Sequence, residues 1–392
     1  CPQVEHVNAR PSAGGRAADA PAAHPAARTA EIRSVLAAMP GRRAPSDTLS
    51  GQGVAGRITQ APAALAPAVS VVVPTYRRPL LLRRCLQALL AQTLAADAFE
   101  IIVVDDGRSA DTRAVIDDLR AALGPDAHPR LHCLEPQGTR GPAGARNRGW
   151  RAARGAIIAF TDDDTVPAPT WLAAGLRLLE TEPQAAAVSG AVLVPLGADP
   201  TDHARNTHQL ESAGFVTANC FVRRAAMEQV GGFDERFTRA WREDSDLAFS
   251  LRTQGLRVIE SGRPVVVHPV RPVGWGHAVR AHSNLVFDAL LYKKHPAMYR
   301  ERVRRHPPWQ YYVTVLAFAA MLGFAAAGLR LGAAIAGSLW LALTLAFAAR
   351  RLRGTSRRLA HRVEVVVTSF AIPFVAVFWR LAGALRWRVL FF

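Results

Sequence analysis

Residues 69–76 read VSVVVPTY, and this stretch decides the fold that the sequence predicts. The run at 69–74 is almost wholly apolar and rich in valine, which is typical of a strand buried on both faces. Pro74-Thr75-Tyr76 ends the run and begins a loop. We therefore expect a buried β-strand that carries polar groups at its carboxyl end.

The same alternation continues along the next part of the chain. Apolar residues have helical spacing at 80–90, and helices are also predicted at 110–123 and, from a segment rich in Gly, Ala and Arg, at 141–154. Further apolar runs predict strands at 99–104, 130–134 and 156–160. Because strands alternate with helices, the sheet should be largely parallel and covered by helices on both faces. The predicted fold class is α/β with a doubly wound sheet.

Polar clusters follow three of these strands. They are Pro74-Thr75-Tyr76, Asp105-Asp106 and Asp162-Asp163-Asp164. The carboxyl ends of parallel strands meet at one edge of a sheet, where ligands of such folds bind. Three adjacent carboxylates repel one another unless a cation is present, and such oxygen ligands suit Mg²⁺ or Mn²⁺ beside substrate phosphates. The alternative for the aspartates is a solvated turn or the N-cap of a helix at 168–180.

The charge of the 392-residue chain is unevenly distributed. Its net charge is +17, but residues 299–392 carry fourteen arginines and two acidic residues while the central part is nearly neutral. A nucleic-acid binder needs a basic face on its folded domain, so we expect no nucleic-acid partner. Residues 1–67 are rich in Ala, Pro, Gly and Arg and are predicted to be disordered.

The four cysteines and the N-terminal region bear on the cellular compartment. The cysteines form no C-x-x-C pair, so neither a disulfide framework nor a zinc site is predicted. Residues 1–68 lack the apolar core of a signal peptide. We expect a reducing, cytoplasmic setting for the soluble part of the chain.

The C-terminal part contains two apolar stretches that are long enough to cross a bilayer. Residues 309–329 and 331–349 each match a hydrocarbon core of about 30 Å. Arginines cluster before this pair, at 300–305, and after it, at 350–362. By the positive-inside rule both clusters lie in the cytoplasm, which predicts a membrane hairpin. The alternative is a buried helical domain of a soluble protein.

The organisation that follows is a catalytic domain at 68–300 and a membrane region at 301–392. We expect a multi-pass protein of the inner membrane with its catalytic domain in the cytoplasm. A third apolar segment, at 363–379, is shorter and contains Pro373. The sequence leaves open whether this segment spans the membrane or lies at its surface.

Six short motifs, taken together, resemble family 2 glycosyltransferases. In chain order they are VVPTY at 72–76, VDDG at 104–107, ARNRG at 145–149, FTDDD at 160–164, GGFD at 231–234 and EDSDL at 243–247. The resemblance covers roughly residues 69–275. It implies the GT-A fold with a mixed sheet, a nucleotide-diphospho-sugar donor, Mg²⁺ or Mn²⁺ as cofactor, and inversion at the anomeric carbon.

The resemblance also implies which residues bind the nucleotide. Thr75 and Arg77 would border the base and the diphosphate. Asp105 or Asp106 would accept a hydrogen bond from the base. A carboxylate suits the N3–H of uracil, so a UDP-sugar is the favoured donor. Arg146 and Asn147 would lie on a helix packed under the nucleotide, with a structural role as the alternative for Arg146.

The metal and sugar sites are carried over in the same way. Asp162 and Asp164 stand at the D-x-D positions, where Asp162 would face the ribose or sugar and Asp164 the metal. His268, at the end of a strand predicted at 265–267, is a second candidate metal ligand and otherwise a structural histidine. Asn219 and Trp241 would flank the sugar or acceptor pocket.

The candidate catalytic base belongs to the Glu243-Asp244 pair, which opens a helix predicted at 243–254. A carboxylate within hydrogen-bond reach of the acceptor hydroxyl can take its proton during attack. The resemblance assigns this role to Asp244 and places Glu243 beside the substrate. The alternative for Asp244 is capping of the helix N-terminus.

Other enzyme classes with alternating strands and helices would need different motifs. A dinucleotide-dependent oxidoreductase needs G-x-G-x-x-G after the first strand, and this chain has none there. A nucleotidyltransferase of related fold and a catalytically inactive nucleotide-sugar-binding scaffold remain the alternatives. Processive members of the resembling family carry Q-x-x-R-W, whereas Gly383 precedes Arg386-Trp387 here. We expect transfer of one sugar to a lipid-linked or envelope glycan acceptor.

Overall fold

The structure is a computed structural model that describes residues 66–125 and 127–391. The disorder predicted for residues 1–67 therefore falls, except at its last two residues, outside the described part of the chain. The centre of the fold is an eight-stranded sheet with the order β3-β2-β1-β4-β7-β6-β8-β5. Its strands are β1 (Val69–Thr75), β2 (Phe99–Asp105), β3 (Arg130–Leu134), β4 (Ile157–Phe160), β5 (Val166–Pro167), β6 (Ala185–Leu193), β7 (Cys220–Arg223) and β8 (Arg257–Val267).

The sheet is mixed, with one half entirely parallel. β3, β2, β1 and β4 run parallel in the predicted alternating order. β7 lies antiparallel between β4 and β6, and the short β5 pairs antiparallel with β8 at the edge. A continuous apolar run does not reveal the direction of its strand. The alternation of strands and helices therefore predicted the parallel half of the sheet, and the antiparallel strands were implied only by the family resemblance.

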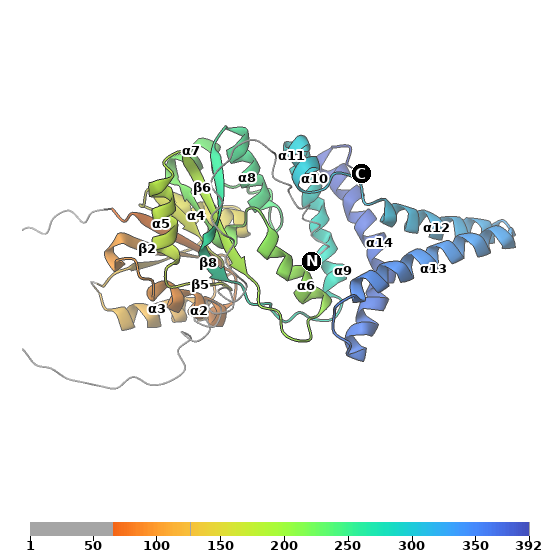
Figure 1. The fold of residues 1–392 in the computed structure, drawn as a ribbon, viewed down its shortest axis with the longest axis horizontal. Coiled ribbons are helices and arrows are strands. Elements are labelled where there is room, and N and C mark those ends of the chain that lie inside the picture. The colour runs from red at the N-terminus through yellow and green to blue at the C-terminus, as the bar shows by residue number, and fades with distance from the viewer. Residues whose placement is uncertain (1–65, 126, 392) are drawn as a thin grey trace, which may run out of the picture.

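Helices cover both faces of the sheet, as predicted (Figure 1). Up to Arg302, the helices are α2 (Pro79–Leu90), α3 (Ala110–Leu123), α4 (Pro142–Ala152), α5 (Trp171–Thr181), α6 (Asp202–His208), α7 (Arg224–Val230), α8 (Glu243–Thr253), α9 (His277–Ala281), α10 (Val286–Lys294) and α11 (Pro296–Arg302). Leu82, Ile116 and Trp171 bury one face, whereas Trp150 and Leu247 belong to the core on the other. Short 3-10 turns lie at η1 (Ala96–Ala98), η2 (Gln209–Ser212), η3 (Thr217–Asn219) and η4 (His282–Leu285).

Three long apolar helices end the described chain. They are α12 (Trp309–Ala326), α13 (Arg330–Leu352) and α14 (Leu359–Trp387), and each is long and apolar enough to cross a membrane. α12 and α13 form the predicted hairpin, which projects away from the sheet and its helices (Figure 1). α14 is longer than the apolar run at 363–379, because it continues through Pro373 and through polar ends.

Candidate active site

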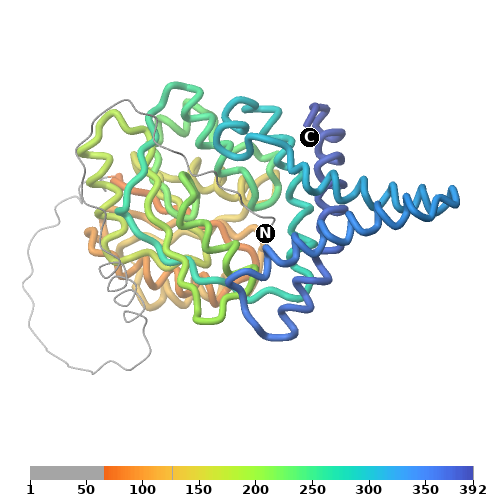
Figure 2. The backbone as a smooth tube through the Cα atoms, turned by 45° about the vertical axis from the view of Figure 1, so that its right-hand side comes forward, coloured from red at the N-terminus to blue at the C-terminus, as the bar shows by residue number. Residues whose placement is uncertain are grey.

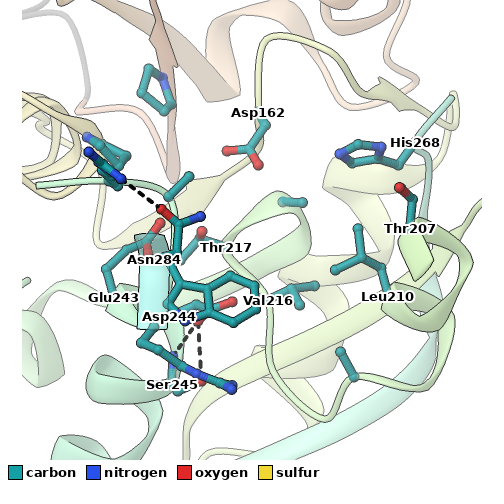
Figure 3. A pocket seen from close by; sticks show the side chains of 18 of the residues that line it. Asp162, Thr207, Leu210, Val216, Thr217, Glu243, Asp244, Ser245, His268 and Asn284 are labelled. Carbon is teal, nitrogen blue, oxygen red and sulfur yellow. Dashed lines mark hydrogen bonds between the residues drawn. The ribbon is translucent and has the colours of Figure 1, made fainter. Parts of the chain in front are cut away.

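A cavity of about 2020 Å³ lies at the carboxyl edge of the parallel half of the sheet. The ends of β1 and β4, the segment around α6 and η2, the start of α8, and α9 with η4 line it. Asp162, His268 and Asp244 reach it from three different parts of the chain (Figure 3). The predicted meeting of strand ends at one edge is thus what the fold produces.

Asp162, Asp164 and His268 form a group that could hold a metal ion. One ligand atom from each lies within 4.8 Å of the others. Two carboxylate oxygens and an imidazole nitrogen suit a divalent cation such as Mn²⁺. The Nδ1 atom of His268 is buried and has no hydrogen-bond partner in the described structure. The residues present therefore fit the divalent cation that the resemblance implies.

Two arginines approach the same aspartates. Arg271 Nε lies 2.9 Å from Asp164, and Arg78 Nη1 lies 3.0 Å from Asp163 and 3.9 Å from Asp164. They offset the repulsion among adjacent carboxylates, and their guanidinium groups suit phosphate oxygens. Neither arginine was predicted as a site residue. Their signal in the sequence was closeness to predicted positions, since Arg78 follows Arg77 and Arg271 follows His268 by three residues.

Asp163, the middle aspartate, holds the loop in place. Its carboxylate accepts hydrogen bonds from Thr75 Oγ1 at 2.7 Å and from Arg78 at 3.0 Å. Burial raises the pKa of Asp163 to about 6, and the neighbouring Asp164 adds to this effect while Arg78 opposes it. Thr75 is buried and lines the cavity, so the end of β1 is joined directly to the aspartate loop. The helix that the aspartates could have capped begins only at Trp171, with Thr170 as its N-cap residue.

Arg146 joins the aspartate loop to the start of α8. Its guanidinium lies 2.7 Å from Asp162 and 3.0 Å from Glu243, and it is almost fully buried. Arg146 therefore holds both Asp162, a candidate metal ligand, and Glu243, which precedes the candidate base. Arg146 also lines the cavity, so a role in structure and contact with a ligand are compatible.

Glu243 and Asp244 are the first two residues of α8, as predicted. Burial raises the pKa of both carboxyl groups above their ordinary values. Asp244 Oδ1 accepts a hydrogen bond from the Ser245 backbone N–H at 2.6 Å, and Asp244 lines the cavity. A carboxylate with a raised pKa that faces a ligand cavity is a suitable general base.

The turn before α8 is held by a buried aspartate. Arg242, which precedes the helix, has a φ of 74°. Asp288 of α10 accepts hydrogen bonds from Trp241 Nε1 at 2.7 Å, from Arg242 Nε at 2.8 Å and from Tyr299 OH at 3.0 Å. Trp241 lines the cavity, and Asp288 fixes its indole there.

The aspartates that follow β2 have different positions. Both carboxylate oxygens of Asp105 accept backbone N–H groups, from Gly107 at 3.0 Å and Ser109 at 2.7 Å, and the side chain stays in its own turn. Asp106 lines the cavity and accepts the Gly141 N–H at 2.9 Å. Its second oxygen is buried without a partner in the described structure. Of the two, Asp106 is placed to accept a hydrogen bond from a base.

Gly141 makes this arrangement possible. Its φ is 105°, and a Cβ at this position would lie 2.5 Å from the Thr238 carbonyl oxygen. Pro142 then begins α4 at a position where the missing N–H costs no helical hydrogen bond. The glycine-rich run at 138–149, which does not fit a dinucleotide fingerprint, thus forms part of the cavity wall beside Asp106.

Besides Asp105, three predicted substrate residues lie outside the cavity lining in the described structure. Asn147 exchanges hydrogen bonds with Phe233 and with neighbouring side chains. Asn219 binds Trp171 and two backbone carbonyl groups. Arg77 lies over the Tyr76 ring, with its side chain close to Gly107. All three support the walls of the site.

One wall of the cavity is formed by a segment for which the sequence predicted no structure. Residues 195–215 contain α6 and η2, and Thr207 and Leu210 from these elements face the cavity (Figure 3). The signal for α6 was Thr201, whose hydroxyl caps the helix by accepting the Ala204 N–H at 3.1 Å.

Two family models match the chain. The model described as Glycosyl transferase family 2 matches residues 70–239, and that described as Glycosyl transferase family group 2 matches residues 157–379, more than half of the chain. The chain belongs to glycosyltransferase family 2. It is therefore a transferase of sugar groups, with the GT-A fold and with C-terminal helices that fit a membrane. The nucleotidyltransferase alternative is set aside.

Several individual relatives are also similar to this chain. Glycosyltransferase AglE of Haloferax volcanii is 28% identical over 53% of this chain and 69% of its own length. Validoxylamine A glucosyltransferase of Streptomyces hygroscopicus is 28% identical over 60% of this chain and 63% of its own length, less than two thirds. A GalNAc(5)-diNAcBac-PP-undecaprenol glucosyltransferase of Campylobacter jejuni is 35% identical over 25% of this chain and 30% of its own.

A solved structure resembles most of this chain. The mannosyltransferase PcManGT from Pyrobaculum calidifontis, in complex with GDP-Man and Mn²⁺, aligns with a TM-score of 0.55 at 25% identity. The alignment covers 82% of this chain and 89% of that one. The metal in that complex agrees in kind with the ligand set of Asp162, Asp164 and His268.

Proposed function

We propose that this glycosyltransferase moves one sugar from a nucleotide-diphospho-sugar to a hydroxyl group of a lipid-linked or envelope glycan, with inversion at the anomeric carbon. The observation that carries the proposal is the placement of Asp244 in the same cavity as Asp162, Asp164 and His268. The apolar helix α14 packs against α9 and η4, which line that cavity, and this supports an acceptor that resides in a membrane. The Campylobacter relative, named for a polyprenyl-linked substrate, points to the same class.

The donor's diphosphate would bind at the aspartate loop. Asp164 and His268, with Asp162, would hold Mg²⁺ or Mn²⁺, which when bound offsets the negative charge of the departing diphosphate. Arg78 and Arg271 would approach the phosphate oxygens, to which guanidinium groups bind in a bidentate way. Asp106 would accept a hydrogen bond from the base. This is compatible with a UDP-sugar, and the GDP-Man neighbour makes GDP-sugars the second donor class to test.

Asp244 would take the proton of the acceptor hydroxyl. As the acceptor oxygen forms its bond to the anomeric carbon, the bond from that carbon to the diphosphate oxygen breaks. The nucleoside diphosphate leaves with the electron pair, so this end of the reaction needs no acid. Trp241, held by Asp288, would form the wall against which the sugar or acceptor lies.

The experiment uses the full chain in detergent micelles with UDP- and GDP-sugars, each with and without Mn²⁺, and with a polyprenyl-diphosphate-linked sugar as the acceptor. Metal-dependent release of UDP or GDP by the wild type, and its loss in Asp244→Asn, is the expected result. NMR of the transferred sugar should show an inverted anomeric configuration. If the Asp244→Asn variant releases nucleotide as well as the wild type does, or if the configuration is retained, the proposed mechanism is wrong.

The proposal also includes orientation. The sheet with helices α2 to α11, called the catalytic part below, and both arginine clusters would lie in the cytoplasm, on the inner membrane of a bacterial cell. The acceptor's glycan would then be extended before the lipid-linked product leaves the cytoplasmic leaflet. Protease added to sealed inverted membrane vesicles should cut loops of the catalytic part, and protection of those loops would contradict this orientation.

A further inference from the structure

α14 is held by the catalytic part near both of its ends. Close to its start, Glu364 accepts the backbone N–H of Gly276, just before α9, at 2.8 Å. Close to its end, Trp387 Nε1 donates to the Val286 carbonyl oxygen at 2.9 Å. Glu364 and Trp387 are separated by about 35 Å of helix, more than the thickness of a bilayer core. A helix that crossed the bilayer would need the catalytic part on both sides of it.

The contacts at the end of α14 are those of a protein core. Phe391 is fully buried, with its ring 5.3 Å from that of Tyr292 and 5.4 Å from that of Tyr299. A Cβ at Gly383 would lie 3.0 Å from Val286 Cα, so the small residue lets α14 and α10 approach closely. The Gly383 that replaces the glutamine of the processive motif therefore has a packing role.

The opposite face of α14 carries a continuous apolar stripe. Its members follow one another at intervals of three or four residues, the spacing of one helix face. They are Leu359, Val363, Val367, Phe370, Phe374, Phe378, Leu381 and Leu385. Leu359, Phe378 and Leu385 are 78%, 61% and 82% exposed. The stripe thus runs along almost the whole helix and is not covered by the described chain at either end.

The middle of the stripe packs against residues halfway along the two helices of the hairpin. The Phe374 ring lies 5.1 Å from that of Phe318 in α12, and the Phe370 ring lies 5.7 Å from that of Trp340 in α13. In both views the hairpin points away from the catalytic part, and α14 runs across its base (Figures 1 and 2). The stripe therefore faces the side to which the hairpin extends.

Burial and charge distinguish α14 from the hairpin. Of the 18 most apolar consecutive residues, 44% are buried in α14, compared with 17% in α12 and in α13. Exposed arginines flank the stripe at both ends, at Arg357 and Arg362 and again at Arg386 and Arg388. A helix with one apolar face and cationic ends suits the boundary between acyl chains and anionic headgroups.

We propose that α14 lies flat in the membrane surface on the side of the catalytic part, with its apolar stripe against the lipid, while only the α12–α13 hairpin enters the bilayer core. The three helices that are apolar enough to span would then provide two spans and one in-plane helix. The proposal does not depend on which sugar is transferred.

Depth measurements test this proposal on the full chain. Cys1 and Cys133 are replaced by serine, whereas Cys85 and Cys220 are kept because they are buried. Single cysteines at Val363, Phe378 or Leu385 carry a fluorophore in liposomes of phosphatidylglycerol and phosphatidylcholine. Nitroxide lipids labelled near the headgroup should quench all three more strongly than lipids labelled deep in the acyl chain. Deeper quenching at Phe378 than at the two flanking sites would show a spanning helix and overturn the proposal.

A control in the hairpin and a second measurement complete the test. A fluorophore at Leu339, an exposed position in α13, should be quenched most by the lipid labelled deep in the acyl chain. If neither labelled lipid quenched this fluorophore, the hairpin would not enter the bilayer and the proposal would also be wrong. Cysteines at Arg357 and at Arg388 should react with an impermeant maleimide from the same side of sealed liposomes. Reaction from opposite sides would contradict an in-plane α14 even if the labelled variants were inactive.

Discussion

At the scale of single residues, Asp244 is the side chain on which transfer should depend most. Asp244→Asn removes the proton acceptor but keeps its size, so we expect kcat to fall by about 10²- to 10⁴-fold. Donor affinity, measured by calorimetry with the nucleotide sugar, should stay within about twofold. Glu301→Gln, which changes another carboxyl group lining the same cavity, is the matched control. Near-normal kcat in Asp244→Asn would remove Asp244 from the mechanism.

The raised pKa of Asp244 adds a pH dependence. A general base works only when deprotonated, so kcat/KM should fall as the pH drops through this raised pKa. The acidic limb of the wild-type profile should therefore lie above the pH at which an ordinary aspartate titrates. Because Glu243 is adjacent and buried, Glu243→Gln should move this limb to lower pH. An unchanged acidic limb in Glu243→Gln would mean that another group controls it.

His268 can be tested without turnover. His268→Ala removes the imidazole from the group formed with Asp162 and Asp164, and Mn²⁺ affinity should fall at least about tenfold. Electron paramagnetic resonance of Mn²⁺ with the full chain measures this directly. His203→Ala changes a different histidine of the cavity and should leave the affinity unaltered. Equal Mn²⁺ binding by the His268 variant and the wild type would make His268 a structural residue.

At the scale of elements, the turn before α8 should depend on Asp288. Asp288→Asn leaves the buried Arg242 guanidinium without its carboxylate, and we expect the free energy of unfolding to fall by about 2–4 kcal/mol. Since Trp241 loses its fixed position, kcat should fall while the KM for the nucleotide sugar changes little. Tyr299→Phe removes a hydrogen bond to the same carboxylate but keeps the Arg242 pair, so it should cost only about 1 kcal/mol.

If Asp288→Asn and Tyr299→Phe reduced stability and activity by the same amount, the ion pair between Asp288 and Arg242 would not be what positions the turn before α8. The comparison separates positioning of the α8 turn from general weakening of the α10–α11 core. Both variants are measured by thermal unfolding and by initial rates over a range of donor concentrations.

The sequence predicted the secondary-structure elements better than the positions of single residues in the turns between them. The alternation of apolar runs and helical spacing predicted β1, β2, β3 and β4 with their helices, because local pattern decides elements that are buried on both faces. Which neighbour of a predicted residue reaches the ligand was not predictable. Asp106 rather than Asp105, and Arg78 beside Arg77, face the cavity because of turn geometry that the pattern does not encode.

The same limit applies to the C-terminal helices. Hydropathy measures how apolar α14 is, but not which of its faces the catalytic part covers. Val365 and Ile372 are buried while Val363 and Val367 are exposed, and this division depends on packing against distant residues. Long-range contacts therefore decide between a spanning and an in-plane helix, which is why the sequence left the choice open.

At the scale of the whole molecule, the parallel half of the sheet is joined at the edge opposite the cavity by Glu100. Its carboxylate accepts hydrogen bonds from Ser70 Oγ at 2.7 Å and from the Arg154 backbone N–H at 2.7 Å and Nε at 3.0 Å. Burial alone would raise its pKa, but His132, Ser70 and Arg154 lower it to about 2. One side chain thus connects β2 with β1, β3 and the segment before β4.

The sign of the resulting pH dependence follows from linkage. Because the folded-state pKa lies below that of the unfolded chain, Glu100 contributes stability above about pH 4.5, and this contribution is lost as the pH falls towards about 2. Glu100→Gln should lower the free energy of unfolding by about 2–3 kcal/mol at pH 7. The difference from the wild type should disappear near pH 2, as measured by thermal unfolding in detergent micelles.

Activity separates this effect from the site. Glu100 lies at the amino end of β2, away from the cavity, so the folded Glu100→Gln variant should keep its kcat at temperatures well below unfolding. Glu182→Gln removes a carboxylate whose pair with Arg257 is exposed, and it should change stability by no more than about 0.5 kcal/mol. A stability loss in Glu100→Gln that stayed constant from pH 7 to pH 2 would show that packing, and not the charge of Glu100, joins the strands.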